Sequence, residues 1–293
     1  MAAASSGCLA ATPRRGEAVL EPLFSISGAR LISRTDVGGN AMPGDLAQYV
    51  PLAFPVAAAA SFNDIYIADA GAARLYRYDR ALDAMAVMPE PRVTATTRLQ
   101  AGPDGSIYVL DTFASEIRRY TRGGQALPAL RPRLGTSRYA NFAVDPLNAK
   151  VYAVDSAHLS IDEIQPLGQL SIEYQRLGTA GPIATDGRGL FVADARCGCV
   201  VEWIDGRAGR RFGGGKLQLP LSLAVGERHQ IYAVAGSDRS IVLVHEEGVE
   251  PLSPASLGLL MPESIAAAQG MVLVADGAGH RVAAFRPGTR RER

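Results

Sequence analysis

Two cysteines separated by one glycine, Cys197 and Cys199, have a spacing that suggests metal or redox chemistry. A closed zinc site needs about four Cys or His ligands, and no further thiol or imidazole is placed to complete one here. A disulfide between residues so close in the chain is tightly constrained, although Gly198 gives the backbone more freedom to form it. We therefore assign no metal to the pair and predict that Cys197 and Cys199 can form a disulfide.

Other motifs with catalytic chemistry are absent from the sequence. There is no Gly-x-Ser-x-Gly, no phosphate-binding P-loop and no dinucleotide fingerprint. The segment FGGGK at 212–216 has glycines and a lysine, but LPLSLAV follows it instead of a helical pattern, which indicates a turn. The formal net charge of +1 provides no overall field for nucleic acid or an anionic membrane. Nucleic acid is therefore not a predicted partner, and a membrane is one only through a possible lipid anchor at Cys8.

Five segments of the chain end with a short apolar run and an aspartate, and a sixth has alanine in place of the aspartate. Their anchor residues recur about every 41 positions and are Asp69, Asp111, Asp155, Asp194, Ala235 and Asp276. Six residues after each anchor stands an aliphatic side chain, and nine residues after it stands a large apolar one. This odd spacing places the two side chains on opposite faces of an extended strand. Both faces must therefore be covered by other parts of the protein.

Each repeat predicts four short antiparallel strands, which is the content of one propeller blade. The predicted fold is therefore an all-β, six-bladed β-propeller of four-stranded antiparallel blades. Only RPGTRRER follows Phe285, which is too short for a last fourth strand, so an N-terminal strand should close the ring. The segment ARLISRTDVGG at 29–39 is the predicted closing strand. Residues 21–287 would form the propeller, flanked by tails at 1–20 and 288–293.

The segments IYIADAGAARLYRYD and VLVADGAGHRVAAF resemble NHL repeats, whose signature runs aliphatic, aromatic, Val, Ala, Asp, a loop, Arg-Ile and Phe. The resemblance covers roughly residues 50–287 and implies a six-bladed propeller without implying an activity, because propellers host unrelated functions. The chain departs from the signature in lacking the usual loop asparagine. The arginine is present only at Arg74 and Arg281.

In a propeller, the loops after the second strands and before the first strands share one end of the ring, where we expect a ligand. The anchor aspartates begin these loops, and we interpret them as caps that accept hydrogen bonds from turn amides. The candidate partner-binding residues at this end are Arg98, Tyr139, Asn141, His158, Arg196, Glu263 and His280.

The histidines do not predict a zinc site. His158 and His280 belong to blades three and six, across the ring from one another, while His229 and His245 fall at the opposite end. The three-histidine site of the amidating lyases, which are NHL-type zinc propellers, therefore has no counterpart.

Calcium is the alternative metal. The calcium-dependent propeller hydrolases hold the ion with Glu, Asn and Asp in the channel. Asn141 and Glu263 offer such oxygens, but Arg98 would repel the ion. We expect no cofactor, with Ca²⁺ as the alternative.

A rigid ring of variable loops without a convergent catalytic set is typical of a binding platform. We predict a non-enzymatic propeller whose loop face engages a protein or glycan partner in a multiprotein assembly. The alternative is a Ca²⁺-dependent hydrolase or lyase with its site at the central channel.

The first residues, MAAASSGC, resemble the end of a bacterial lipoprotein signal, although the charged and apolar regions of a secretory signal are missing. They predict lipidation at Cys8 and a bacterial cell-envelope location, in the periplasm or at the outer membrane, with a cytoplasmic location as the alternative.

Overall fold

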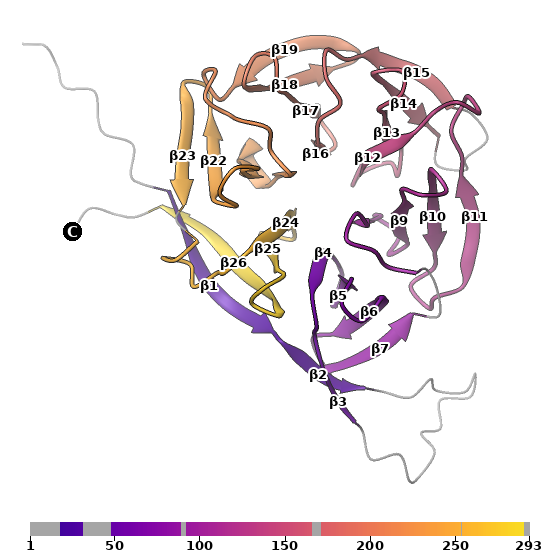
Figure 1. The fold of residues 1–293 in the computed structure, drawn as a ribbon, viewed down its shortest axis with the longest axis vertical. Coiled ribbons are helices and arrows are strands. Elements are labelled where there is room, and N and C mark those ends of the chain that lie inside the picture. The colour runs from indigo at the N-terminus through magenta and orange to yellow at the C-terminus, as the bar shows by residue number, and fades with distance from the viewer. Residues whose placement is uncertain (1–17, 32–47, 89–91, 166–170, 253, 290–293) are drawn as a thin grey trace, which may run out of the picture.

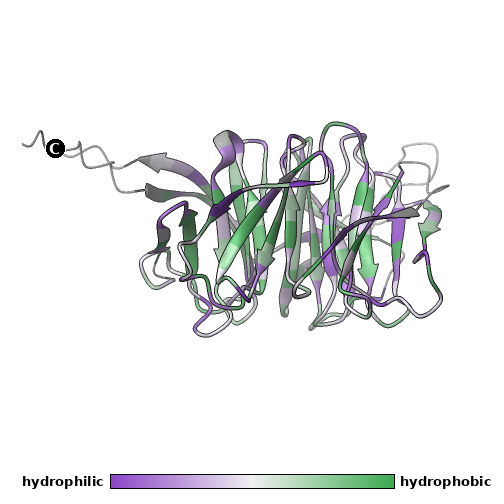
Figure 2. Ribbon diagram, turned by 90° about the horizontal axis from the view of Figure 1, so that it is seen from above, coloured by the Kyte–Doolittle hydropathy of each residue, from purple (hydrophilic) through white to green (hydrophobic). Residues whose placement is uncertain are grey.

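The computed structural model describes residues 18–31, 48–88, 92–165, 171–252 and 254–289. Six β-sheets stand around a central axis (Figure 1), and a view turned by 90° shows their strands running between the two ends of a flat disc (Figure 2). Within the described residues the only helix is one short 3-10 turn, η1 (Glu227–His229). The predicted all-β, six-bladed propeller is therefore confirmed.

Each blade runs from an innermost strand near the axis to an outermost one. Blade one contains β4 (Pro55–Ser61), β5 (Asp64–Asp69), β6 (Arg74–Asp79) and β7 (Ala84–Met88), and blade two contains β8 (Arg98–Ala101), β9 (Ile107–Asp111), β10 (Glu116–Tyr120) and β11 (Ala126–Leu130). Blade three contains β12 (Tyr139–Val144), β13 (Val151–Asp155), β14 (Ser160–Ile164) and β15 (Ser171–Arg176). Blade four contains β16 (Ile183–Thr185), β17 (Leu190–Asp194), β18 (Cys199–Ile204) and β19 (Arg207–Phe212). Blade five contains β20 (Ser222–Val225), β21 (Ile231–Val234), β22 (Ile241–His245) and β23 (Gly248–Leu252).

Blade six is built from both ends of the chain. Its inner strands are β24 (Pro262–Ala268), β25 (Met271–Asp276) and β26 (Arg281–Thr289), and β1 (Ala18–Ile26) pairs antiparallel with β26 on the outside. The prediction that an N-terminal strand closes the ring is thus confirmed. The pairing reaches Ala18 and Thr289, slightly beyond the predicted propeller limits of 21 and 287.

The prediction that residues 29–39 form the closing strand was wrong. Of that segment, the described residues belong to β2 (Gly28–Leu31), which pairs with β3 (Tyr49–Pro51) and runs parallel to β7 at the outside of blade one. The closing strand β1 contributes Leu20 and Ile26, which are 5% and 2% exposed and pack into the cores on either side of blade six. The segment 29–39 was favoured because its polar composition is typical of an outermost strand, but any exposed outer strand has such a composition.

The hydrophobic core lies between blades. The aliphatic side chains six residues after each anchor are all 0% exposed and are Leu75, Ile117, Ile161, Val200, Ile241 and Val282. Separate apolar clusters join neighbouring sheets, for example blades five and six and then blades six and one. Burying one such side chain contributes about 1.5–3 kcal/mol, so the ring is stabilised by covering both faces of every sheet, as the repeat predicts.

The anchor aspartates tie each second strand to the loop that enters the blade. Asp69 is fully buried and accepts N–H bonds from Ala53 at 2.7 Å, Phe54 at 2.8 Å and Ala72 at 3.1 Å. Asp276 likewise accepts the N–H of Met261 at 2.7 Å. The interpretation of these residues as turn caps is therefore confirmed.

Blade five shows why one anchor can be alanine. Phe54 and Met261 each lie 15 residues before their anchor, and the residue 15 positions before Ala235 is Pro220. Proline has no backbone N–H, so the donor and the acceptor are missing together. The proline accounts for one of the three bonds that Asp69 accepts, because Leu219 and Asp238, which correspond to Ala53 and Ala72, keep their N–H groups.

Candidate functional site

We call the end of the ring formed by the turns between first and second strands the hairpin end, and the opposite end the loop end. A cavity of about 860 Å³ opens at the hairpin end and is lined by residues from all six blades. We call it the axial cavity. Its volume falls within the range of about 300–1,000 Å³ that is usual for small-molecule sites.

The floor of the axial cavity is made of small apolar side chains. They come from the last residues of the innermost strands and include Ala59, Ala60, Ala101, Val144, Val225, Ala266, Ala267 and Ala268. These strands lie closest to the axis, where six chains converge and larger side chains would fill the space. The sequence therefore leaves an apolar hollow with its polar groups confined to the rim.

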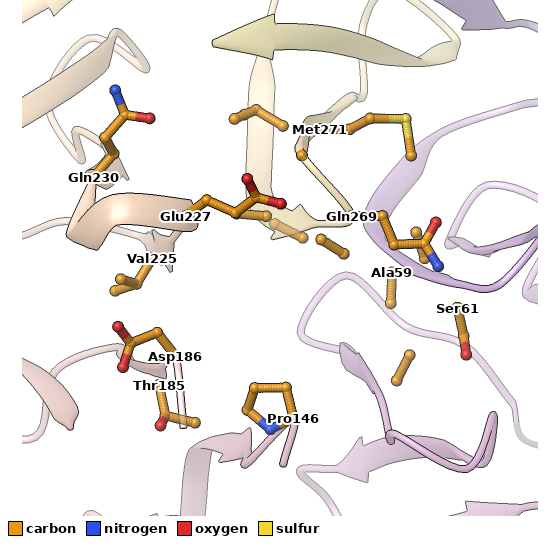
Figure 3. Close-up of a pocket in the computed structure, with 18 of the residues that line it drawn as sticks. Ala59, Ser61, Pro146, Thr185, Asp186, Val225, Glu227, Gln230, Gln269 and Met271 are labelled. Atoms are coloured by element: carbon orange, nitrogen blue, oxygen red, sulfur yellow. The ribbon is translucent and has the colours of Figure 1, made fainter. Parts of the chain in front are cut away.

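On the side of blades four and five, the rim carries acidic groups and one imidazole. His229 Nδ1 lies 2.8 Å from Asp186 Oδ2 of the neighbouring turn, but the angle between the two groups does not make a hydrogen bond. Glu227 is exposed, and its carboxylate has no hydrogen bond to another described residue. Gln230 accepts a hydrogen bond from the Tyr232 hydroxyl at 3.2 Å, which leaves its amide NH₂ free to donate. Figure 3 shows Asp186 on one side of the opening and Glu227 between Gln230 and Gln269.

On the side of blades six, one and two, the rim carries amides, a hydroxyl and an aromatic ring. Gln269 is exposed and Gln100 is half-buried, and neither side chain has a hydrogen bond to the rest of the described chain. Ser61 lies beside Phe62 in the turn of blade one. Phe62 is 56% exposed, although it is one of the largest apolar side chains at the rim.

Three of these rim residues have left-handed backbone conformations. The φ angle is 52° at Phe62, 59° at His229 and 55° at Gln269, whereas the turns of blades two and four have glycine in that conformation at Gly105 and Gly187. A bulky side chain at positive φ costs backbone energy that glycine avoids. The turn of blade three also has a side chain in this conformation, at Ala149, with a φ of 60°. Among the residues that line the axial cavity, the bulky side chains at positive φ come from the neighbouring blades five, six and one.

At the loop end, the structure brings two of the predicted site residues near each other. Burial lowers the pKa of Arg98, while the nearby Glu263 carboxylate acts in the opposite direction. Arg98 Nε is buried without a hydrogen-bond partner, and no carboxylate of a described residue lies within 4.0 Å of its guanidinium. Glu263 is bound instead by Arg239, whose Nη1 is 2.5 Å from Glu263 Oε2.

The predicted tyrosine and asparagine are occupied by structural contacts in blade three. Tyr139 is 2% exposed, and its hydroxyl donates to Asp162 Oδ2 at 3.0 Å. Asn141 Oδ1 accepts the N–H of Phe142 at 2.9 Å. Both residues thus have local partners within the blade.

The predicted histidines lie in separate blades, as expected from the repeat. His158 Nδ1 is 2.6 Å from Asp155 Oδ2, and His158 Nε2 is 3.2 Å from Thr136 Oγ1. Burial raises the pKa of Asp155, but hydrogen bonds from backbone amides, from Ser137 and from His158 outweigh it and lower the value to about 2.

The remaining two loop-end residues are also apart from one another. His280 Nδ1 lies 2.5 Å from the Ala53 carbonyl oxygen, so it connects blade six to blade one. Arg196 is exposed on blade four beside Gly178. The structure therefore does not gather the seven predicted residues into one site.

The oxygens proposed for calcium are engaged by protein groups. Glu263 is bound by Arg239 and Asn141 by a backbone N–H, and the positive charge of Arg98 lies in the same region. Among the described residues, no group of three or more His, Cys, Asp or Glu side chains is placed to share a metal ion.

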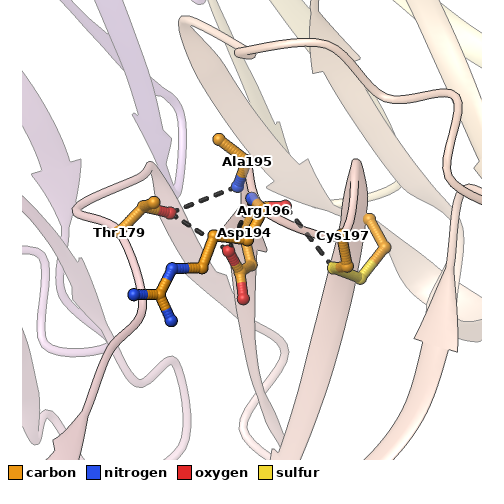
Figure 4. Close-up of a disulfide and its surroundings, with 6 residues drawn as sticks. Thr179, Asp194, Ala195, Arg196 and Cys197 are labelled. Atoms are coloured by element: carbon orange, nitrogen blue, oxygen red, sulfur yellow. Dashed lines mark hydrogen bonds between the residues drawn. A yellow bond between two sulfur atoms is a disulfide. The ribbon is translucent and has the colours of Figure 1, made fainter.

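Cys197 and Cys199 form a disulfide, with their Cα atoms 5.1 Å apart (Figure 4). Gly198 has a φ of 56°, and Cys197 Sγ lies 3.4 Å from the Asp194 carbonyl oxygen. The bridge therefore fixes the turn after β17. Cys8 lies outside the described residues, and no helix among those described is long and apolar enough to cross a membrane.

The sequence predicts a ligand at the loop end, whereas the axial cavity that the structure shows opens at the hairpin end. The available signal was the turn ASFND, where Phe62 stands at a position that favours Gly, Asn or Asp. An apolar ring in such a turn has no role in the core, so it indicates a surface role.

The chain matches no protein-family model and no curated protein. Among solved structures it is similar to a streptogramin B lyase, with 14% identity, a TM-score of 0.58 and coverage of 82% of this chain and 85% of that one. A Bacteroides thetaiotaomicron protein of unknown function has 15% identity and a TM-score of 0.65, with 93% and 77% coverage. An auxiliary nutrient binding protein from Bacteroides ovatus has 17% identity and a TM-score of 0.57, with 77% and 66% coverage. At these identities the similarity establishes the propeller fold, and the NHL resemblance stays a prediction.

Proposed function

We propose that this chain is a non-enzymatic binding propeller that holds a protein or glycan partner at the axial cavity. The observation that supports it best is the convergence of free polar groups around an apolar hollow on the ring axis. Glu227, Gln269 and Gln100 approach this space from three blades, and each has hydrogen-bonding groups that no other described residue uses. An apolar pocket with a few convergent polar groups is the usual form of a binding site.

The alternative is a Ca²⁺-dependent hydrolase or lyase at the channel. The similar structures include both a lyase and nutrient binding proteins, so the fold accommodates either activity. The engagement of Glu263 by Arg239, beside the positive Arg98, favours binding over calcium chemistry at the loop end.

We further propose a cell-envelope location with a lipid anchor at Cys8. The small residues before Cys8 support the anchor, and the similarity to nutrient binding proteins of Bacteroides fits such a location. Intact mass of the protein from its native host should show a lipid on a chain that begins at Cys8. An unmodified chain that retains Met1 would contradict the anchor.

The binding proposal is tested with arrays of oligosaccharides and of peptides, followed by mass analysis of the bound ligand. We expect a ligand that is recovered unchanged and whose affinity falls about fivefold to tenfold in Gln269→Ala, since one hydrogen bond contributes about 1 kcal/mol. The matched control is Gln125→Ala, an exposed glutamine in an outer turn that does not line the axial cavity. Conversion of the ligand to a product of different mass would refute the non-enzymatic proposal.

A further inference from the structure

We propose that the axial cavity binds a saccharide without anionic groups, and that Phe62 is the surface on which a sugar ring stacks. This inference rests on the binding function proposed above and names the class of its ligand. It is carried by the arc of the rim formed by blades five, six and one.

Phe62 is not placed where folding alone would put a phenylalanine. It is 56% exposed, and its φ of 52° is costly for a bulky side chain. Glycine occupies the left-handed turn position in blade two, at Gly105, so the fold does not require a side chain there. Strained and exposed residues of this kind concentrate at functional sites.

The ring of Phe62 is held against the neighbouring turn. A Cβ added at Gly105 would lie 3.1 Å from Phe62 Cε2, which shows that the ring lies against the backbone of blade two. A flat apolar surface fixed in this way can pack against the C–H groups of a pyranose ring, which an exposed aliphatic side chain does less well.

The polar groups of the same arc suit sugar hydroxyls. A hydroxyl both donates and accepts, and a carboxamide offers both functions in one plane. Gln269 lies next to Phe62 in the ring of blades and has the same left-handed backbone, with a φ of 55°. Gln100 follows on blade two, and Ser61 adds a hydroxyl beside the aromatic ring.

The charges at the rim disfavour an anionic ligand. Asp186 and Glu227 both line the axial cavity, and the Arg286 guanidinium at its edge is bound by Glu21 at 3.0 Å. Arg188 also lines the axial cavity and is exposed, but it belongs to the same turn as Asp186, whose carboxylate offsets its charge. The carboxylates would repel uronic acids and sulfated sugars. Neutral sugars carry no charge to be repelled, and the ammonium group of an amino sugar would be attracted.

A peptide is the competing class. A peptide that adds to a sheet needs a free strand edge, and one that inserts side chains needs deep apolar pockets. The floor of the axial cavity consists of alanines and valines at the ends of the innermost strands, which leave one common hollow and not a series of separate side-chain pockets. The floor of small side chains and the planar groups at the rim therefore favour a sugar.

The test uses the full chain on an array of neutral, amino-sugar, uronate and sulfated oligosaccharides and on a peptide array, with titration calorimetry of the best-bound probe. We expect neutral or amino-sugar probes to bind, with affinity about tenfold lower in Phe62→Ala, since aromatic contacts of this kind contribute up to about that factor. The matched control is Phe113→Ala, which removes a fully exposed phenylalanine at the loop end and should change affinity less than twofold.

A second variant separates binding from folding. Phe62→Gly relieves the positive-φ strain, so it should raise the unfolding temperature while weakening sugar binding as much as Phe62→Ala does. Retention of peptides alone, with loss in Phe62→Ala, would overturn the saccharide inference and leave the binding function standing. Retention of no probe of either class, or chemical conversion of a bound one, would overturn the binding function itself. Equal sugar affinity in wild type and Phe62→Ala would overturn the role of Phe62.

Discussion

Replacing Asp69 by alanine should lower the free energy of unfolding by about 3–5 kcal/mol. Asp69 is fully buried and accepts three backbone N–H groups, from Ala53 at 2.7 Å, Phe54 at 2.8 Å and Ala72 at 3.1 Å. Hydrogen bonds to a charged acceptor contribute about 1.5–3 kcal/mol each. The expected loss is smaller than the sum of the three bonds, because water can reach part of this turn in the variant and bind the freed N–H groups.

The reverse change in blade five provides the internal comparison. Ala235→Asp should change the free energy of unfolding by less than the loss in Asp69→Ala, because Pro220 cannot donate the N–H that corresponds to that of Phe54. Glu247→Ala, at an exposed position whose carboxylate has no hydrogen bond to another described residue, is the surface control and should cost less than about 1 kcal/mol.

The assay is urea unfolding at pH 7, followed by circular dichroism, with the free energy taken from the midpoint and slope. A loss below about 1 kcal/mol in Asp69→Ala would refute the account of the anchors as amide caps. A gain in Ala235→Asp as large as that loss would refute the explanation based on proline.

Three further predictions concern pH, buried charge and ring closure. The pKa of Asp155 is lowered to about 2, because hydrogen bonds to the carboxylate outweigh the burial that raises it. The ionised carboxylate therefore stabilises the folded state above about pH 4, and this stabilisation is lost as the pH falls toward 2. Unfolding measured from pH 5 to pH 2 should show a loss of about 2 kcal/mol that Asp155→Asn removes, and an unchanged slope in that variant would contradict this. Arg98→Met should keep or raise the midpoint of urea unfolding, since it removes a half-buried charge that no carboxylate of a described residue approaches within 4.0 Å. Arg239→Met should lower the midpoint by breaking the bond to a half-buried partner. Ile26→Ala in the closing strand should cost about 3 kcal/mol in the same assay and Leu23→Ala, at 41% exposure, less than about 1, and equal costs would show that β1 does not close the ring through its buried face.

The fold could be predicted because the repeat encodes the packing of every blade. The residues six positions after the anchors, such as Ile117 and Val200, are fully buried in all six blades, so one pattern determines the whole ring. The closing strand could not be predicted in the same way, since β1 lies outside the repeat. Its identity depends on where Leu20 and Ile26 are buried, between sheets built from the other end of the chain.

The candidate site could be predicted less well, because it depends on which end of the ring is hollow. The repeat places Arg98 and Glu263 at the loop end, but it does not show that Arg239, from another blade, binds Glu263. The axial cavity arises where the innermost strands end in small residues such as Ala59 and Ala267, which the sequence shows only once the six blades are superimposed. Phe62 was visible in the turn ASFND, but its exposure and its backbone conformation required the structure.

Hydrogen exchange of the full chain, free and saturated with the best-bound array probe, tests the central claim most directly. The account predicts slower exchange in the turns of the hairpin end, at 61–64, 226–230 and 268–271, with no change in the loops at 70–73, 156–159 and 277–280. Protection confined to those loops, with the hairpin turns unchanged, would contradict the assignment of the axial cavity as the binding site.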